Sequence, residues 1–273
     1  MTFSTLMVHL ELEHSNDARL RIAGDLAEQF DAKLIGIAAA DPQPTFYANG
    51  EFAQSLIAQN RAEIKKRMAE TEERFRSAMH QRARDIEWRS AMARPLDYVT
   101  REARAADLII TGVNRDGILL DPLRRLDPSD LVMQAGRPIF VVPPEAEYLK
   151  LKCALVAWKD TREARRAVAD ALPLLHKAKE VAVVEVIEDD ANRSEAHARV
   201  DDVAAWLGRH GITAFGRVFH AVEEEDQIDK IWQYGADFLV AGAYGHTRLR
   251  EWVFGGFTRS LLTRSRHCSF LAH

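Results

Sequence analysis

The sequence predicts an α/β fold with two tandem open sheets, each of five parallel strands flanked by helices. Short apolar runs alternate with helical patterns along the chain, and this alternation occurs twice. The two copies also superpose without gaps at a constant offset, since 236 − 106 = 130 brings Ala236-Asp237 onto Ala106-Asp107. Parallel strands need right-handed crossovers, so each sheet is expected to have helices on both faces.

The first half contains five expected strands, each a short apolar or alternating run: 6–10, 34–38, 86–92, 108–110 and 139–142. The expected helices are 17–30, 51–82, 98–104 and 129–135. In the first helix, Leu20, Ala23, Ala27 and Phe30 follow a 3.6-residue period, and the second is a long amphipathic pattern with many charges on one side. Prolines and glycine mark 41–50 as a loop, and 112–126 is another.

The second half repeats this order. Its expected strands are 155–158, 181–186, 214–219, 238–240 and 268–272, and its expected helices are 161–175, 192–211 and 226–234. A polar segment with two prolines, 143–147, lies near the middle of the chain and marks the boundary. We therefore expect an N-terminal domain at 1–145 and a C-terminal domain at 149–273.

Composition limits the classes of partner. A formal net charge of −4 and a pI near 6.2 give no reason to expect nucleic acid or an anionic membrane as partner. No apolar run approaches the roughly 20 residues that span a bilayer, and no basic segment follows Met1, so a cytoplasmic protein is expected. Cys153 and Cys268 lie beside expected strands, which favours reduced, buried thiols. No spacing of cysteine and histidine predicts a metal site.

A glycine-rich loop after the fourth strand of the second half carries the functional signal. Gly242, Gly245, Gly255 and Gly256 lie between that strand and a helical pattern that includes Thr258. Glycine lets backbone N–H groups approach an anion, and a helix N-terminus has unpaired donors, so the order strand, loop and helix is typical of a phosphate site. Glycines that serve only as turns are the alternative.

The spacing Gly-x2-Gly-x9-Gly at 242, 245 and 255, the Ala-Asp before the strand and the doubled layout resemble the universal stress protein family in its tandem form. The resemblance covers essentially the whole chain and implies a Rossmann-like fold of the adenine-nucleotide alpha-hydrolase type that binds ATP, accompanied by Mg²⁺. The phosphate positions that it implies are Gly242, Gly245, Gly255, Gly256, Phe257 and Thr258. It also implies Val186, Ala157 and Asp160 as contacts for adenine and ribose, and no catalytic residue or metal ligand.

Two positions depart from the family pattern. Gly256 stands where a Ser or Thr is usual, which predicts weaker phosphate binding unless Thr258 replaces that hydroxyl. Lys159 stands where an Asp is usual after the first strand, and Asp160 takes the acidic role if the chain is shifted by one residue.

The first half departs much further. At the same offset, Arg115, Arg125, Leu126 and Pro128 replace Gly245, Gly255, Gly256 and Thr258, so we expect no ATP there. Glu11, Glu13 and His14 follow the first strand and suggest either a metal pair or a solvated loop, of which the loop is favoured. Arg115, Arg124 and Arg125 are expected to pair with Asp121 and Asp127 rather than to bind another anion.

The resemblance favours a nucleotide-responsive regulatory or stress-tolerance protein that binds rather than reacts. A slow ATPase or phosphotransferase is one alternative, with His246, Arg248 and Arg250 within reach of a terminal phosphate. A scaffold without nucleotide is another, in which the terminal strand 270–272 offers an exposed edge to a partner. The two halves are expected to form a pseudo-dimer within the chain, and a homodimer stays open.

Overall fold

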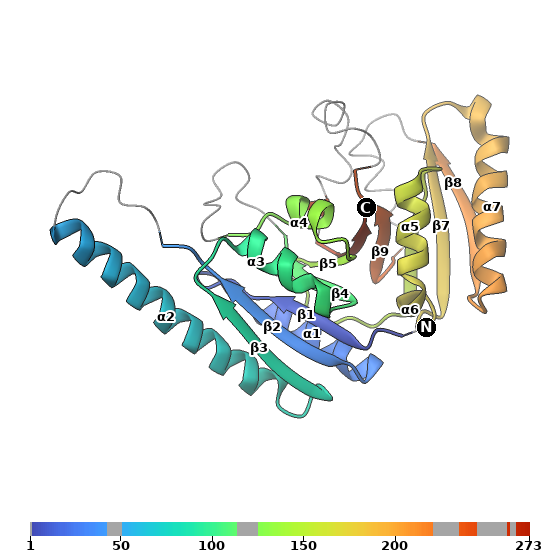
Figure 1. The fold of residues 1–273 in the computed structure, drawn as a ribbon. Helices are drawn as coiled ribbons and strands as arrows, with labels where there is room; N and C mark the ends of the chain where they lie inside the picture. The colour runs from blue at the N-terminus through green and yellow to red at the C-terminus, as the bar shows by residue number, and fades with distance from the viewer. Residues whose placement is uncertain (1, 43–50, 114–124, 221–234, 245–260, 263–265) are drawn as a thin grey trace.

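The computed structural model describes residues 2–42, 51–113, 125–220, 235–244, 261–262 and 266–273, and for 51–53 only the backbone. The strands of these residues form one sheet of ten, in the order β3-β2-β1-β4-β5-β10-β9-β6-β7-β8. Figure 1 shows the first half running into the second along this sheet, with helices on both faces. The predicted α/β class is confirmed, but the two five-stranded sheets are joined edge to edge.

The elements of the first half lie close to their predicted ranges. Its strands are β1 (Thr5–His9), β2 (Lys33–Ala39), β3 (Asp85–Ala91), β4 (Leu108–Gly112) and β5 (Ile139–Val142). Its helices are α1 (Asp17–Phe30), α2 (Glu51–Met79), α3 (Pro95–Glu102) and α4 (Pro128–Gln134), with a short 3-10 turn at Ala103–Ala105. Pro95 and Pro128 each stand in the first turn of a helix, where a missing N–H costs nothing, which explains why α3 and α4 begin earlier than predicted.

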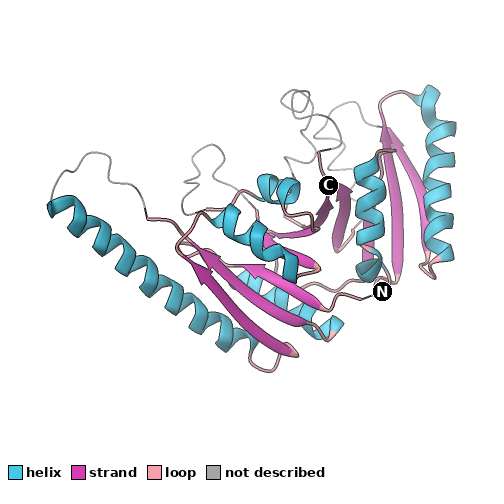
Figure 2. Ribbon diagram, viewed as in Figure 1, coloured by secondary structure: helices cyan, strands magenta, loops and turns pink. Residues whose placement is uncertain are grey.

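The second half follows the same order (Figure 2). Its strands are β6 (Cys153–Ala157), β7 (Glu180–Ile187), β8 (Ala214–His220), β9 (Phe238–Gly242) and β10 (Cys268–Ala272). Its helices are α5 (Arg162–Asp170), α6 (Leu172–Leu175) and α7 (Arg193–Arg209), the last preceded by a 3-10 turn at Asp190–Asn192. The expected helix 226–234 lies outside the described residues.

The single helix expected at 161–175 is divided into α5 and α6. Pro173 lies in the first turn of α6 and has no N–H to donate to a preceding turn. The Ala171 N–H donates to the Ala167 carbonyl at 2.9 Å as the C-cap of α5, whose last residue is Asp170. The expectation of one continuous helix was therefore wrong, for a reason visible in the sequence.

Strand order places β10 in the interior of the sheet. Within each half all pairs are parallel, whereas β10 pairs with β5 antiparallel and with β9 parallel. The prediction that the terminal strand 270–272 offers an exposed edge was therefore wrong, because both of its sides are occupied. Among the described strands the sheet ends at β3 and β8.

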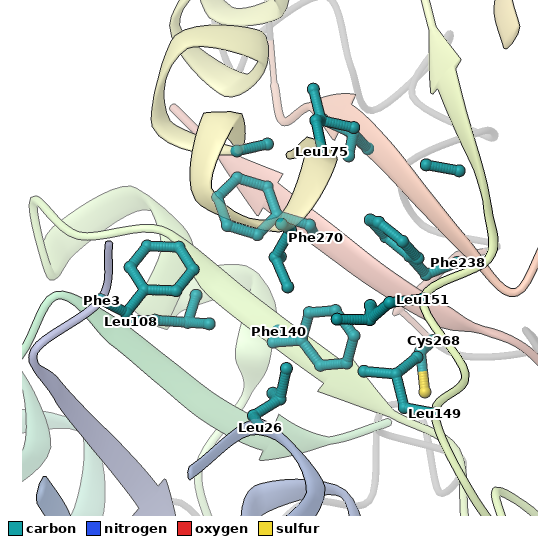
Figure 3. Close-up of a cluster of buried hydrophobic side chains, with 14 of the residues drawn as sticks. Phe3, Leu26, Leu108, Phe140, Leu149, Leu151, Leu175, Phe238, Cys268 and Phe270 are labelled. Atoms are coloured by element: carbon teal, nitrogen blue, oxygen red, sulfur yellow. The ribbon is translucent and has the colours of Figure 1, made fainter. Parts of the chain in front are cut away.

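One apolar core runs beneath both halves on the face covered by α1, α2, α5, α6 and α7. At the junction, Phe140, Phe238 and Phe270 lie beside one another, with Phe140 and Phe238 ring centroids 6.4 Å apart (Figure 3). The opposite face is covered by α3 and α4 and has a second core. A core shared by both halves makes the junction a packed interior rather than a hinge.

The connection between the halves packs against α1. Leu149 and Leu151, just after the polar segment 143–147 that was expected to mark the boundary, are buried in the shared core, as Figure 3 shows. The Leu149 N–H donates to Asp25 Oδ2 at 3.1 Å, and Gln29 Nε2 donates to the Leu149 carbonyl at 3.3 Å. The connection thus fixes the second half against a helix of the first.

The aspartate of each repeated Ala-Asp pair binds backbone N–H groups at the end of the sheet where the strands begin. Asp107 Oδ2 accepts hydrogen bonds from the Ser4 and Thr5 N–H groups at 2.8 and 3.0 Å. Asp237 Oδ2 accepts from the N–H groups of Lys152, just before β6, and of Cys153, its first residue, at 2.7 and 2.9 Å. In each half, the residue before the fourth strand therefore anchors the start of the first strand.

Candidate functional site

Each half has one point where strand order reverses. In the first half β1 and β4 are neighbours there, and in the second half β6 and β9 are. Crevices for ligands in open α/β sheets form at such points, beyond the carboxyl ends of the strands. Gly112 ends β4 and Gly242 ends β9, as the sequence predicted, so both switch points lie next to a glycine.

Four of the predicted site residues are described, and all lie at or just beyond the carboxyl ends of their strands. Ala157 ends β6 and faces Ala241 in the register with β9. Val186 lies near the end of β7 and is partly buried against the core, and Asp160 follows β6 in the turn before α5. Gly245, Gly255, Gly256, Phe257 and Thr258 lie outside the described residues, as do His246, Arg248 and Arg250.

Close packing explains the glycine at 242 without any ligand. A Cβ atom there would lie 2.5 Å from the backbone N of Ala164 and 2.6 Å from the carbonyl carbon of Glu163. Backbone atoms of a helix cannot move aside as a flexible side chain can. Gly242 therefore lets the N-terminal turn of α5 lie directly on the end of β9, at the switch point.

The N-terminal turn of α5 is capped by Thr161, whose Oγ1 accepts a hydrogen bond from the Ala164 N–H at 3.3 Å. Glu163 is 3% exposed, and burial alone would raise its pKa, but hydrogen bonds from Arg162, from its own backbone N–H and from Thr161 outweigh burial and lower it. Within the described residues no group hydrogen-bonds to Glu163 Oε2. This turn thus combines oriented N–H groups with one buried carboxylate.

The turn between β6 and α5 is short. The Trp158 N–H donates to the Val184 carbonyl at 2.7 Å, which continues the pairing of β6 with β7. Trp158 packs against the shared core. Asp160 is exposed and forms an ion pair with Arg165, so its carboxylate lies at the surface rather than over the sheet.

The switch point of the first half is filled by charged side chains. Arg19, from the first turn of α1, is only 6% exposed and lies over Gly112, where its guanidinium carbon would be 3.3 Å from a Cβ atom. Its Nη1 is 3.4 Å from Glu11 Oε1, and Arg125 Nη2 is 3.9 Å from Glu11 Oε2. His9 ends β1 beneath them, with Nδ1 3.5 Å from Thr111 Oγ1.

Burial and charge both act on these groups. Burial is the main reason that the pKa of His9 falls from 6.5 to about 4, and the positive charge of Arg19 adds to it. Burial alone would raise the pKa of Glu11, but Arg19, His9, Arg125 and His14 together outweigh it and lower that pKa. At neutral pH the cluster therefore holds a neutral imidazole, a carboxylate and two guanidinium groups.

The loop after β1 was expected to be solvated, and for Glu11 this expectation was wrong. Its side chain is 10% exposed because Arg19 and His14 cover it, while His14 itself is exposed. Among the described residues no group of three His, Cys, Asp or Glu side chains is arranged to hold a metal ion. Arg125 approaches Glu11, and Asp127 accepts from the Ser129 N–H at 2.8 Å as the cap of α4.

Comparison with solved structures identifies the architecture. A universal stress protein from Archaeoglobus fulgidus DSM 4304 matches with a TM-score of 0.72 over 98% of this chain and 95% of its own, at 14% identity. A putative universal stress protein from Pseudomonas aeruginosa UCBPP-PA14 matches with a TM-score of 0.56 over 99% of this chain and 93% of its own, also at 14% identity. The chain has the universal stress protein fold. No family model matches the sequence, and no curated protein matches it.

In this universal stress protein fold each five-stranded half has its own switch point. Among the described helices none is long and apolar enough to cross a membrane.

Arg19 was not predicted from the sequence, although it is the residue by which the two switch points of this universal stress protein fold differ most clearly. A signal was present, because Arg19 lies three and seven positions before Ile22 and Leu26, on the buried stripe of α1. A cation in such a stripe must be paired, and Glu11 was the available partner.

Proposed function

We propose that this chain binds an adenine nucleotide, ATP accompanied by Mg²⁺, in its C-terminal half and acts as a nucleotide-responsive stress-tolerance protein of the cytoplasm. The position of Gly242 carries the proposal. It ends β9 at the switch point of the second half and begins the spacing Gly-x2-Gly-x9-Gly, which resembles the nucleotide loop of universal stress proteins. The proposed domains are 1–145 and 149–273, the second with the nucleotide loop.

In this proposal the loop residues Gly245, Gly255, Gly256, Phe257 and Thr258 surround the phosphates, and Ala157, Val186 and Asp160 lie toward adenine and ribose. Ala157 and Val186 are suited to an aromatic base, since both are apolar and lie at the ends of neighbouring strands, Ala157 as the last residue of β6 and Val186 as the last but one of β7. Asp160 contacts ribose only if it leaves Arg165, so we assign it the weakest contact.

Magnesium in this proposal is held by the phosphate oxygens. Mg²⁺ binds nucleotide phosphates with few protein ligands and keeps several waters, so it needs no carboxylate cage. Among the described residues no cluster of three metal-ligating side chains occurs.

The first experiment is native mass spectrometry of the purified protein, followed by calorimetric titration with ATP in the presence and absence of Mg²⁺. We expect one nucleotide for each chain. Absence of any co-purified nucleotide together with no binding at millimolar ATP would refute the proposal.

Residue exchange between the halves gives a matched pair of variants. Gly245→Arg installs in the second half the residue found at the equivalent place of the first, since 245 − 130 = 115, and it should abolish binding. Arg115→Gly is the reciprocal change and should leave affinity and stoichiometry unaltered. Gly242 is unsuitable for this test, because a side chain there would collide with the backbone of α5 and alter the fold itself.

A further inference from the structure

The first half contains a switch point that the chain fills with its own side chain. Arg19 is held there by three acceptors: the His9 carbonyl at 3.2 Å, the Ser15 carbonyl at 3.3 Å and Glu11 Oε1 at 3.4 Å. These acceptors lie at the end of β1 and in the loop before α1. A guanidinium group with its fixed fork of donors is thereby held at the crevice by one segment of the chain, residues 9–15.

The same position in the second half is occupied by alanine. Counted from the helix caps Asn16 and Thr161, Arg19 and Ala164 are both the third residue of their helix. Both residues also lie against the glycine that ends the fourth strand of their half. A Cβ atom on Gly112 would meet the side chain of Arg19, and one on Gly242 would meet the backbone of Ala164. The backbone of α5 therefore lies against Gly242, whereas at Gly112 the nearest atoms belong to the Arg19 side chain, which fills the space beside the strand end.

A longer loop supplies the counter-ion. Leu10 and Trp158 are equivalent, since each donates its N–H to the second strand of its half, to Ile37 and Val184. Six positions separate Leu10 from its helix cap, whereas three separate Trp158 from its cap. Glu11 lies in this longer loop and is held there by Asn16, whose Oδ1 accepts from the Glu11 N–H at 3.0 Å.

We propose that Arg19 is a built-in occupant of the ligand position in the first half, with Glu11 as its counter-ion, and that it closes this half to phosphate-bearing ligands. The side chain takes the space over Gly112, and its guanidinium is already engaged by the Glu11 carboxylate and by the His9 and Ser15 carbonyls, so these donors are not free to bind a phosphate. This inference concerns the first half alone and holds whether or not the second half binds nucleotide.

Deleting the side chain should leave a guanidinium-shaped vacancy beside a carboxylate that has lost its buried partner and keeps His14 and Arg125 as neighbours. Arg19→Ala should lower the melting temperature by about 10 °C, the scale set by breaking a buried ion pair in a domain of this size. Methylguanidinium chloride at about 10 mM should restore at least half of the loss, compared with the same concentration of sodium chloride. Arg21→Ala is the matched control, because Arg21 lies on the same helix and its guanidinium donates to the carbonyl of Ala146 near the surface.

A melting temperature unchanged in Arg19→Ala, or an equal response of Arg21→Ala to methylguanidinium, would overturn the proposal. Should Arg19→Ala fail to fold, the double variant Arg19→Ala with Glu11→Gln decides instead. It removes the carboxylate charge that faces the vacancy, so it should fold, melt above Arg19→Ala and lose the response to methylguanidinium. A double variant that is unfolded, or that methylguanidinium still stabilises, contradicts the pairing of Arg19 with Glu11.

Discussion

Phe140 of β5 lies directly opposite Phe270 of β10, and 270 − 140 = 130 is the offset of the internal repeat. The flanking pairs obey the same symmetry, since Ile139 faces Leu271 and Val141 faces Ser269. A pseudo-twofold axis therefore passes between the two phenylalanines, and each half presents the same strand to the other. Both rings are fully buried in the shared core.

Phe140→Ala should destabilise both halves together. Truncation of a buried phenylalanine costs about 3–5 kcal/mol, and this one lies in a core to which both halves contribute. Hydrogen exchange followed by mass spectrometry should show protection falling alike in β2 and β7, which lie far from the junction on opposite sides. Phe215→Ala, on the edge strand β8 where the ring is partly exposed, is the control and should cost less. Loss of protection confined to one half would show that the halves are independent.

Ser269 breaks the symmetry of the junction, because its equivalent in the first half is Ile139. Its side chain is fully buried, and within the described part of the chain its Oγ has no hydrogen-bond partner. A buried hydroxyl without a partner costs about 1–3 kcal/mol. Ser269→Ala should therefore raise the free energy of unfolding by about 1 kcal/mol in urea denaturation. Ser90→Ala, at an exposed position of β3, should leave it unaltered, and a destabilised Ser269→Ala would show that the hydroxyl has a partner.

Asp107 and Asp237 should contribute equally to stability. Each carboxylate accepts two backbone N–H groups at the start of the first strand of its half, and hydrogen bonds to a charged group contribute about 1.5–3 kcal/mol. We expect Asp107→Ala and Asp237→Ala to lower the free energy of unfolding by similar amounts on this scale. Asp202→Ala, at an exposed position of α7, provides the reference for loss of a surface charge. A large effect at only one of the two positions would contradict the equivalence.

The sequence was sufficient for the alternation of strands and helices, because apolar runs and caps are local signals. It also located Gly112 and Gly242 at strand ends, since the Ala-Asp before each fourth strand fixes where that strand begins. The physical roles of these residues came only from the structure. Asp107 and Asp237 anchor the strands at the end of the sheet opposite the candidate site. Gly242 leaves room for the backbone of α5.

Contacts between segments far apart in the chain could not be predicted from the sequence. Nothing local distinguishes β10 as an interior strand, because a short apolar run reads the same at an edge and at a junction. Leu149 and Leu151 become buried only because α1 lies beneath them. The Arg19–Glu11 pair was missed because its two members were assigned separately, one to a helix face and one to a loop.

His9 makes the stability of the first half depend on pH between about 4 and 6.5. Its pKa is lowered from 6.5 to about 4, first by burial and then by Arg19, so the unfolded chain takes up a proton in this range and the folded chain does not. Stability therefore falls as the pH is lowered from 6.5 and levels off below 4, with a total loss of about 3 kcal/mol. Glu11, which also faces His9, acts in the same direction but only below its ordinary pKa of 4.5, since its own pKa is lowered.

Urea denaturation at a series of pH values separates the two groups. His9→Gln removes the titrating imidazole and should flatten the dependence of the free energy of unfolding between pH 6.5 and 4.5, while the decline below pH 4.5 persists. His80→Gln is a suitable control, because His80 is exposed at the end of α2 and should leave the slope intact. An unchanged slope in His9→Gln would mean that His9 is protonated in the folded protein. The proton would then lie beside Arg19, where burial and charge both oppose it.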